Sequence, residues 1–425
     1  MRFSPLALFF AALCFVPTHA SAQDAKAQDL PPREILDQII RQLPKPLPPA
    51  KISFEPQASA GADEACRMQN FQMTLARESG GAANRYSVLL DPQPSGSAAP
   101  RQLLAVITRL AVDADGAERA YHPEDPHGKG VCREERDAAG RSVLNGICAL
   151  DNFNPSGIRL YRDAQRARLL NPDKPAPKDD TPNLAALWKD MWPLIRDRKI
   201  KAYDLKAAVA GAPAGYNLFY WKERKLTALT KRAIIPSTND GYPCVRGAES
   251  RHPGYFIAAT TLTKPSAERA DGCAPGRYID ASEVPFFVLP GGDFGHIEIG
   301  DVVIGFFKSG AVERIAFGVA GDAGPIEQFG EGSIAFNQAL RGKAGEPVMN
   351  VQEVNNLDID SSFLKEQGAT LAILVLGGTK KRLGGNYARE NVERIAREEL
   401  VRWNGGGERL TARLNACLAK AKPVQ

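Results

Sequence analysis

Two acidic residues, Asp322 and Glu331, lie in positions where they could act together. Asp322 follows the apolar, strand-like run Arg314–Ala320, and Glu331 precedes Ser333, a residue type that favours a helix N-cap. Two carboxyl groups on a rigid frame are the minimum needed to hydrolyse a glycosidic bond, because one donates a proton and the other activates water. The pattern therefore predicts acid/base hydrolysis if the two side chains face one another.

Each residue also has an ordinary structural interpretation. Asp322 precedes a turn at Gly324 and Pro325, where a carboxylate often accepts hydrogen bonds from its own backbone. Glu331 stands near a predicted helix start, where the helix dipole favours an acidic side chain. The spacing alone does not say which of the two residues would keep the proton.

The rest of the chain narrows the chemistry. It contains no GxSxG, HExxH or GxxxxGK[ST] motif, and neither CxxC pairs nor many histidines, so we expect no metal and no cofactor. The 54 Lys and Arg residues are interspersed with 49 Asp and Glu residues, which is not typical of a nucleic-acid surface.

The first 22 residues have the pattern of an export signal. Arg2 gives a positive start, residues 5–17 are mostly apolar, and Ala20, Ser21 and Ala22 form a small-residue cleavage site. The apolar stretch is too short to span a bilayer, and no later segment is long enough. We therefore expect a secreted or periplasmic protein, cleaved near Ala22, with no transmembrane segment.

Cleavage would leave six cysteines, and an even number in an exported protein predicts up to three disulfides. Six cysteines allow 15 pairings. The preferred set closes two loops of moderate length and leaves a third bond between the two ends of the chain. Its pairs are Cys132 with Cys148, Cys244 with Cys273, and Cys66 with Cys417.

The hydrophobic pattern predicts an α+β fold with a mainly β core. Between residues 216 and 320, short strand-like runs are separated by Gly, Pro and Asp rather than by regular helices, which favours a barrel or sandwich over a doubly wound sheet. The expected strands are Phe71–Leu75, Tyr86–Leu90, Leu103–Val112, Tyr216–Tyr220, Tyr255–Leu262, Val284–Leu289, Asp301–Phe307, Val312–Val319 and Thr370–Leu376.

Helices are expected mainly in the last quarter of the chain. One should start at Ser333 and end at Gly342, and two amphipathic helices should cover Ala388–Trp403 and Glu408–Ala421. A short helix is also expected at Arg33–Leu43, before a Pro-rich break.

Several segments, in order, resemble the chitosanases of glycoside hydrolase family 75. They include a DxDGxxxAYHP-like segment and a GD…GE[AG]S-like signature, and the similarity extends over roughly residues 105–405. The segments are Asp113–Pro123, Gly254–Leu262, Tyr278–Pro290, Gly321–Asp322 with Gly330–Ala335, and Leu371–Trp403.

The resemblance implies a catalytic domain at residues 105–425, built on a small six-stranded, double-psi-like β-barrel decorated by helices. It implies an endo-acting, inverting enzyme that cleaves β-1,4-linked, glucosamine-rich polysaccharide without a cofactor, with Asp322 and Glu331 as the catalytic carboxyl groups. Residues 23–104, with a leader helix and strands, fall outside it and have no assigned role.

Four further residues are candidates for substrate contact. Asp113 and Asp115 could hold ammonium groups, or simply form a turn with Gly116, and Tyr121 and His122 could stack on or hydrogen-bond to a sugar. The basic insert at residues 145–183 would repel chitosan, a polycation, so related amino-sugar glycans stay open as substrates. The alternative is a non-catalytic module that binds glycan or protein in the cell envelope.

Overall fold

A computed structural model describes the chain in segments. These are residues 50–57, 65–77, 84–91, 101–123, 134–136, 142–144, 192–193, 195–198, 203–204, 216–217, 234–236, 238, 240, 242–265, 272–324, 328–348, 351–404 and 410–421. The predicted helix at Arg33–Leu43 lies outside them. The fold is α+β with a mainly β core, as predicted.

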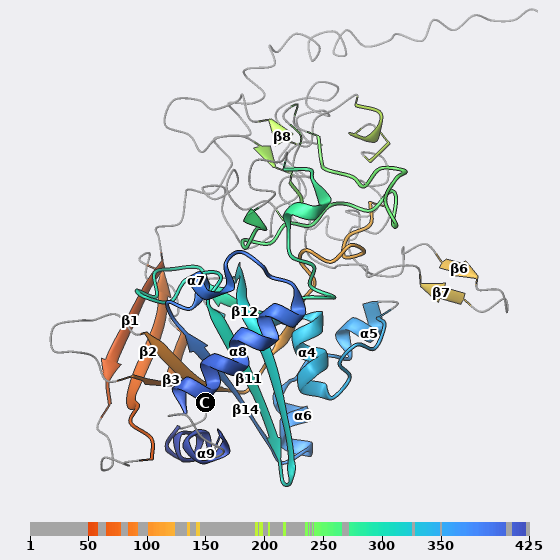
Figure 1. Ribbon diagram of the computed structural model, residues 1–425. Helices are drawn as coiled ribbons and strands as arrows, with labels where there is room; N and C mark the ends of the chain where they lie inside the picture. Colours follow the sequence, from red (N-terminus) through yellow and green to blue (C-terminus); the bar gives the residue numbers. More distant parts are fainter. Residues whose placement is uncertain are drawn as a thin grey trace, which may run out of the picture.

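The centre of the sheet is a long hairpin of β11 (Val302–Ser309) and β12 (Val312–Gly324), with β14 (Ala369–Leu376) on the far side of β11 (Figure 1). Side chains alternate between the two faces of a strand. Ile304 accordingly packs into one hydrophobic core and Val303 into another, so that both faces of the sheet are buried. This explains why these strands read as nearly continuous apolar runs.

Helices cover both faces. Helix α8 (Arg389–Trp403) crosses β11 and β12 on one face, where Arg397 lies over the ring of Phe317 (Figure 1). On the other face, α4 (Ile334–Arg341) presses the ring of Phe336 against glycines of the hairpin. A Cβ atom at Gly305 would lie 2.8 Å from that ring, so only glycine lets the helix approach this closely.

Helix α4 begins and ends where the sequence predicts. Ser333 is its N-cap and accepts a hydrogen bond from the Phe336 N–H, at 3.1 Å. Gly342 ends it in the left-handed conformation, with a φ of 74°.

The described strands pair in an open order of ten, β1-β2-β3-β4-β14-β11-β12-β10-β13-β5, and do not close into a barrel. The predicted six-stranded barrel is therefore not confirmed. At one end of the order, β1, β2 and β3 extend the sheet beyond β4. At the other end, β5 pairs with β13 alone among the described strands. The remaining strands are β1 (Ala50–Pro56), β2 (Gln69–Arg77), β3 (Asn84–Leu90), β4 (Gln102–Ile107), β5 (Ala111–Asp113), β10 (Phe286–Pro290) and β13 (Glu331–Ser333).

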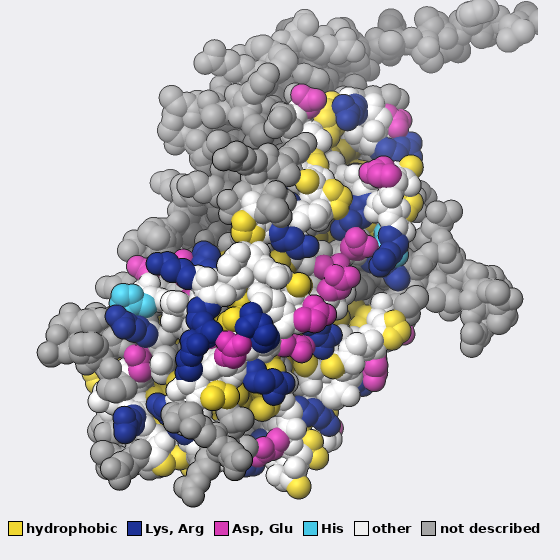
Figure 2. All heavy atoms as spheres, viewed as in Figure 1, with side chains coloured by type: hydrophobic (Ala, Val, Ile, Leu, Met, Phe, Trp, Pro, Cys, Tyr) yellow, Lys and Arg dark blue, Asp and Glu magenta, His cyan; other side chains and the backbone are white. Residues whose placement is uncertain are grey.

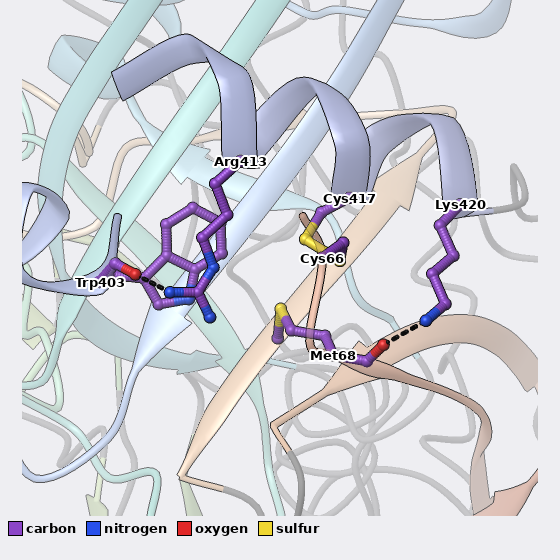
Figure 3. Close-up of a disulfide and its surroundings, with 6 residues drawn as sticks. All are labelled: Cys66, Met68, Trp403, Arg413, Cys417 and Lys420. Atoms are coloured by element: carbon purple, nitrogen blue, oxygen red, sulfur yellow. Dashed lines mark hydrogen bonds between the residues drawn. A yellow bond between two sulfur atoms is a disulfide. The ribbon is translucent and has the colours of Figure 1, made fainter. Parts of the chain in front are cut away.

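The N-terminal strands belong to the same sheet as the proposed catalytic segment. The expected boundary between residues 104 and 105 falls inside β4, which pairs with β3 on one side and β14 on the other. The Cys66–Cys417 disulfide ties the chain just before β2 to helix α9 (Leu410–Lys420), and Lys420 donates a hydrogen bond to the Met68 carbonyl at 2.8 Å (Figure 3).

Two predicted disulfides are confirmed, Cys66–Cys417 and Cys244–Cys273. Cys132 and Cys148 lie outside the described residues.

The strand expected at Tyr255–Leu262 is wrong. Its backbone N–H groups bond to unrelated parts of the chain: Phe256 to Tyr121, Ile257 to Cys244 and Ala259 to Ile234. With no single neighbouring strand, the segment makes only an isolated bridge between Phe256 and Val245.

The expected strand Leu103–Val112 is broken near Leu110 into β4 and β5. Other elements are short. They are the pairs β6 (Glu134–Arg136) with β7 (Ser142–Leu144) and β8 (Tyr203–Asp204) with β9 (Tyr216–Asn217), and helices η4 (Pro275–Arg277), α5 (Val351–Asn355), α6 (Ser361–Glu366) and α7 (Lys380–Leu383). No helix within the described segments is long and apolar enough to span a membrane.

Candidate active site

Three strands bring Asp322 and Glu331 together. Strand β10 pairs in parallel with the end of β12, so that Val288 lies opposite Asp322. On its other side β10 pairs antiparallel with β13 through Phe287 and Gly332, and the next position in that register sets Val288 opposite Glu331. The two carboxylates therefore come from strands on either side of one valine.

A β-bulge directs Asp322 to this face. Phe287 pairs with Ala320 and Val288 with Asp322, which leaves Gly321 without a partner on β10. A Cβ atom at Gly321 would lie 2.5 Å from Phe286 Cβ and 2.7 Å from Ile279 Cδ1. The bulge residue thus has to be glycine.

Gly324 makes room for the second carboxylate. A Cβ atom at this position would lie 2.9 Å from Glu331 Oε2 and 2.7 Å from Val288 Cγ1. The Glu331 side chain therefore points toward the end of β12, two residues beyond Asp322. This close approach fits the Gly-Asp-Ala-Gly stretch of the sequence.

Asp322 is buried and firmly held. Its Oδ1 accepts hydrogen bonds from the N–H of Thr261 at 2.9 Å, from the N–H of Ala323 at 2.7 Å, and from the Thr261 hydroxyl. Donors aimed at one oxygen favour the ionised form of a carboxyl group and fix its direction.

Asp113 and Asp115 join the site from the neighbouring strand. Strand β5 runs parallel to β13, with Asp113 in register with Ser333. One carboxylate oxygen each of Asp113, Asp115 and Asp322 lies within 4.8 Å of the others, and we call these three residues the acid cluster. The Asp115 N–H also donates to Asp113 Oδ1 at 2.8 Å.

Ionising all three carboxyl groups of the acid cluster at once is energetically unfavourable. Burial first, and then the charges of Asp115, Asp322 and Glu331, raise the pKa of Asp113 well above its usual range. Burial and these neighbouring charges therefore favour the protonated form of Asp113. The same spacing would also suit a divalent cation, although groups of carboxylates are common without one.

Tyr121 lies beside the acid cluster, whereas the next residue, His122, has different surroundings. Tyr121 is buried, and its hydroxyl donates a hydrogen bond to Asp115 Oδ1. Burial, followed by the charges of Asp115 and Asp113, raises the pKa of Tyr121 well above 10.0. Its ring is thus unavailable for stacking on a sugar, whereas His122 is only half-buried and packs edge-on to Tyr255 at 4.6 Å.

Sequence reasoning missed the residues that support the strands. Asp358 accepts a hydrogen bond from the Val112 N–H on β5 at 2.7 Å, although it is 246 positions away in the sequence. The Ser333 hydroxyl accepts from the Phe286 N–H and donates to the Val284 carbonyl, which ties β13 to the start of β10. Of these contacts, the nearby sequence indicates only that Ser333 caps a helix.

Comparison with known proteins adds no further evidence on the site. The chain matches no protein-family model, and the search of curated proteins finds no similar sequence. The similarity to family 75 chitosanases therefore rests on the motifs themselves.

Proposed function

We propose that this protein is an endo-acting, inverting glycoside hydrolase that cleaves β-1,4-linked, glucosamine-rich polysaccharide. One observation carries the proposal: Asp322 and Glu331 project from strands on opposite sides of Val288, on the same face of the sheet. Glycines at 321 and 324 are needed for that arrangement. An exported location is part of the proposal, and the two disulfides are compatible with it.

Inversion requires the two carboxyl groups to lie about 6.5–9.5 Å apart, with a water molecule between one of them and the sugar. The strands that carry them are separated by about 10 Å of backbone, and the Glu331 carboxylate leans toward Gly324 on β12. In the reaction, one carboxyl group protonates the glycosidic oxygen as its bond to the anomeric carbon breaks. The other takes a proton from the water that attacks the opposite side of that carbon.

The strand order also supports a barrel-like arrangement of the strands around the site. Strands β4 and β5 are successive parts of one run of chain, separated only by Thr108, Arg109 and Leu110. The series β4-β14-β11-β12-β10-β13-β5 therefore starts and ends on the same run. We propose that this series is a barrel-like unit with six strand positions, in which β4 and β5 count as one, and that β1–β3 are added to it.

The test is hydrolysis by purified protein of chitosan, chitin and peptidoglycan glycan strands, with product sizing and reducing-end assay. Asp322→Asn and Glu331→Gln should each lower kcat by at least about a hundredfold, since each removes one proton-transfer group. Glu366→Gln changes an exposed acid on α6 and should match wild type. Full activity in either site variant would contradict the proposal.

Metal removal separates this mechanism from a cation-dependent one. Activity should survive EDTA, because the proposed steps use only protein carboxyl groups. Loss with EDTA and recovery with Ca²⁺ or Mg²⁺ would instead assign the acid cluster to a metal.

One observation favours the non-catalytic alternative. Asp322 Oδ1 already accepts three hydrogen bonds from the protein, as a purely structural carboxylate would. In that case the protein would bind glycan without hydrolysis, and Asp322→Asn would chiefly lower stability. Binding and turnover measured on the same glycans distinguish the two functions.

A further inference from the structure

A cavity of about 180 Å³ lies beside β13. It is bordered by β3, by the chain that leaves β4, and by the turn that leads into β13. Its lining includes Tyr86, Ile107, Arg109, Gln328, Phe329 and Glu331. The N-terminal strands thus contribute to a hollow that adjoins a proposed catalytic residue.

The walls of this cavity are fixed. The rings of Tyr86 and Phe329 meet edge-to-face with centroids 5.8 Å apart, and the Phe329 N–H donates to the Tyr86 hydroxyl at 3.3 Å. Phe329 also packs against Phe287 on β10, at 5.1 Å. A hollow of this size has room for about six water molecules, which is enough for a sugar substituent.

Arg109 supplies the positive charge. Its side chain is exposed, and it is the cation among the described residues of this lining; its charge partly offsets the effect of burial on the pKa of Asp358. A guanidinium group pairs with carboxylates through two parallel hydrogen bonds. Glu331 also borders the cavity, but its carboxylate is directed toward Gly324 on β12, so Arg109 supplies the charge of the lining that an anionic group would meet.

The charge of the whole chain points the same way. The sequence carries a formal net charge of +5, and basic and acidic side chains are interspersed on the face shown in Figure 2. At long range a positive net charge favours polyanions over a polycation such as fully deacetylated chitosan, whereas the acid cluster contributes negative charge at the site itself.

We propose that this cavity binds a carboxylate-bearing substituent of an amino-sugar glycan, such as a 3-O-lactyl group, through Arg109. The inference rests on the proposed hydrolase function and narrows its substrate. The acidic substituent enters beside Glu331 while the glycan backbone lies over Asp322 and the acid cluster. Tyr86 and Phe329 contact its apolar part.

The experiment compares one glycan in two charge states. Peptide-free peptidoglycan strands keep their lactyl carboxylates, and carbodiimide coupling to ammonia converts these groups to neutral amides. Wild type should cleave the acidic strands at least about tenfold faster at subsaturating concentration, since hydrogen bonds to a charged group are strong. Equal rates on both glycans would overturn the inference while leaving the hydrolase proposal intact.

Variants assign the preference to Arg109. Arg109→Gln should bring the ratio of the two rates close to one, and Arg109→Lys should leave an intermediate ratio. Arg85→Gln is the matched control, because Arg85 is exposed and adjacent to Tyr86 on β3 but is not part of the lining. An unchanged ratio in Arg109→Gln would reject the assignment.

If neither glycan is cleaved, binding measurements test the inference instead. That result would defeat the hydrolase proposal, and calorimetry on the same two glycans would then judge the cavity alone. Tighter binding of the acidic strands that is lost in Arg109→Gln would support the inference. Equal binding of both glycans, or none, would refute it.

Discussion

At the scale of single residues, the site is a collection of acids in unequal surroundings. Asp322 has three donors on one oxygen, whereas Asp113 is buried beside other negative charges. The raised pKa of Asp113 shows how strongly these surroundings act on one carboxyl group, and unequal surroundings are what separate acid from base in a hydrolase.

Asp280 illustrates the cost of burying an acid near this site. Burial raises its pKa to about 6, partly opposed by its hydrogen bonds with Ser282 and reinforced by the charges of Glu283 and Glu118. Because the folded state holds this proton more tightly than the unfolded state, the free energy of unfolding should fall as pH rises from about 4 to about 6. The full cost is about 3 kcal/mol.

Asp280→Asn should remove most of this pH dependence. An amide oxygen can still accept the Ser282 N–H bond, now 2.8 Å long, and carries no charge. Urea unfolding of both proteins at pH 4.5 and pH 7 checks this, with the variant gaining clearly more stability over wild type at pH 7 than at pH 4.5. A parallel pH response of the two proteins would show that Asp280 is not the group responsible.

The residues of the candidate site could be named from the sequence, but most of their contacts could not. The Asp-Ala-Asp-Gly segment and the Gly-Asp and Gly-Glu motifs carried a recognisable pattern. The bond between Asp358 and Val112 spans 246 positions and leaves no local trace. Tyr121 was expected at the sugar, yet its environment is set by distant residues such as Phe256.

At the scale of elements, β12 does two jobs in succession. Residues 312–319 pair antiparallel with β11, and residues 319–324 pair in parallel with β10 on both sides of the bulge at Gly321. A strand that changes partners along its length carries its terminal side chains from the packed core to the edge of the site. Asp322 gains its position from this change.

Gly324→Ala should test the fit between β12 and β13. The added methyl group would meet Glu331 Oε2 and Val288 Cγ1 at less than 3 Å, so the carboxylate must move. We expect kcat to fall at least about tenfold, because small displacements of catalytic groups are costly. Overpacking should lower stability by about 1–3 kcal/mol.

Gly310→Ala serves as the comparison for backbone effects. Gly310 lies in the hairpin turn between β11 and β12, has a φ of 56°, and has open space around its Cβ position. It should lose stability with normal kcat. Normal kcat in Gly324→Ala as well would mean that the Glu331 position is not critical.

Strong local patterns predicted the elements best. The apolar runs of β11, β12 and β14 and the Ser-to-Gly limits of α4 appear nearly where expected. Tyr255–Leu262 has equally apolar residues, but its backbone bonds go to three separate segments. Whether an apolar run becomes a strand thus depends on a neighbour that the local sequence does not specify.

At the scale of the whole molecule, the sheet joins segments from both ends of the described chain. The outer strands β1–β3 attach through β4, and the bond from Cys66 to Cys417 fastens this side to α9. A disulfide limits the freedom of the unfolded chain more strongly when the loop it closes is longer.

Removing the two disulfides should therefore have unequal effects. The separations are 351 residues for Cys66–Cys417 and 29 for Cys244–Cys273. Loop-closure entropy alone assigns about 6 and about 3.5 kcal/mol to these bonds. Thermal and urea unfolding of the two double alanine variants should show the larger loss for Cys66→Ala/Cys417→Ala, and the reverse order would contradict this account.

The Cys66–Cys417 disulfide also depends on the order in which the chain is synthesised. Cys66 is synthesised 351 residues before Cys417, so its native partner does not exist until that long stretch of chain has been made. Cys244 and Cys273 emerge close together and can pair early. A chain that stops anywhere before Cys417 keeps Cys66 without its native partner, and the thiol state of this one residue then reports whether synthesis has passed the last helix.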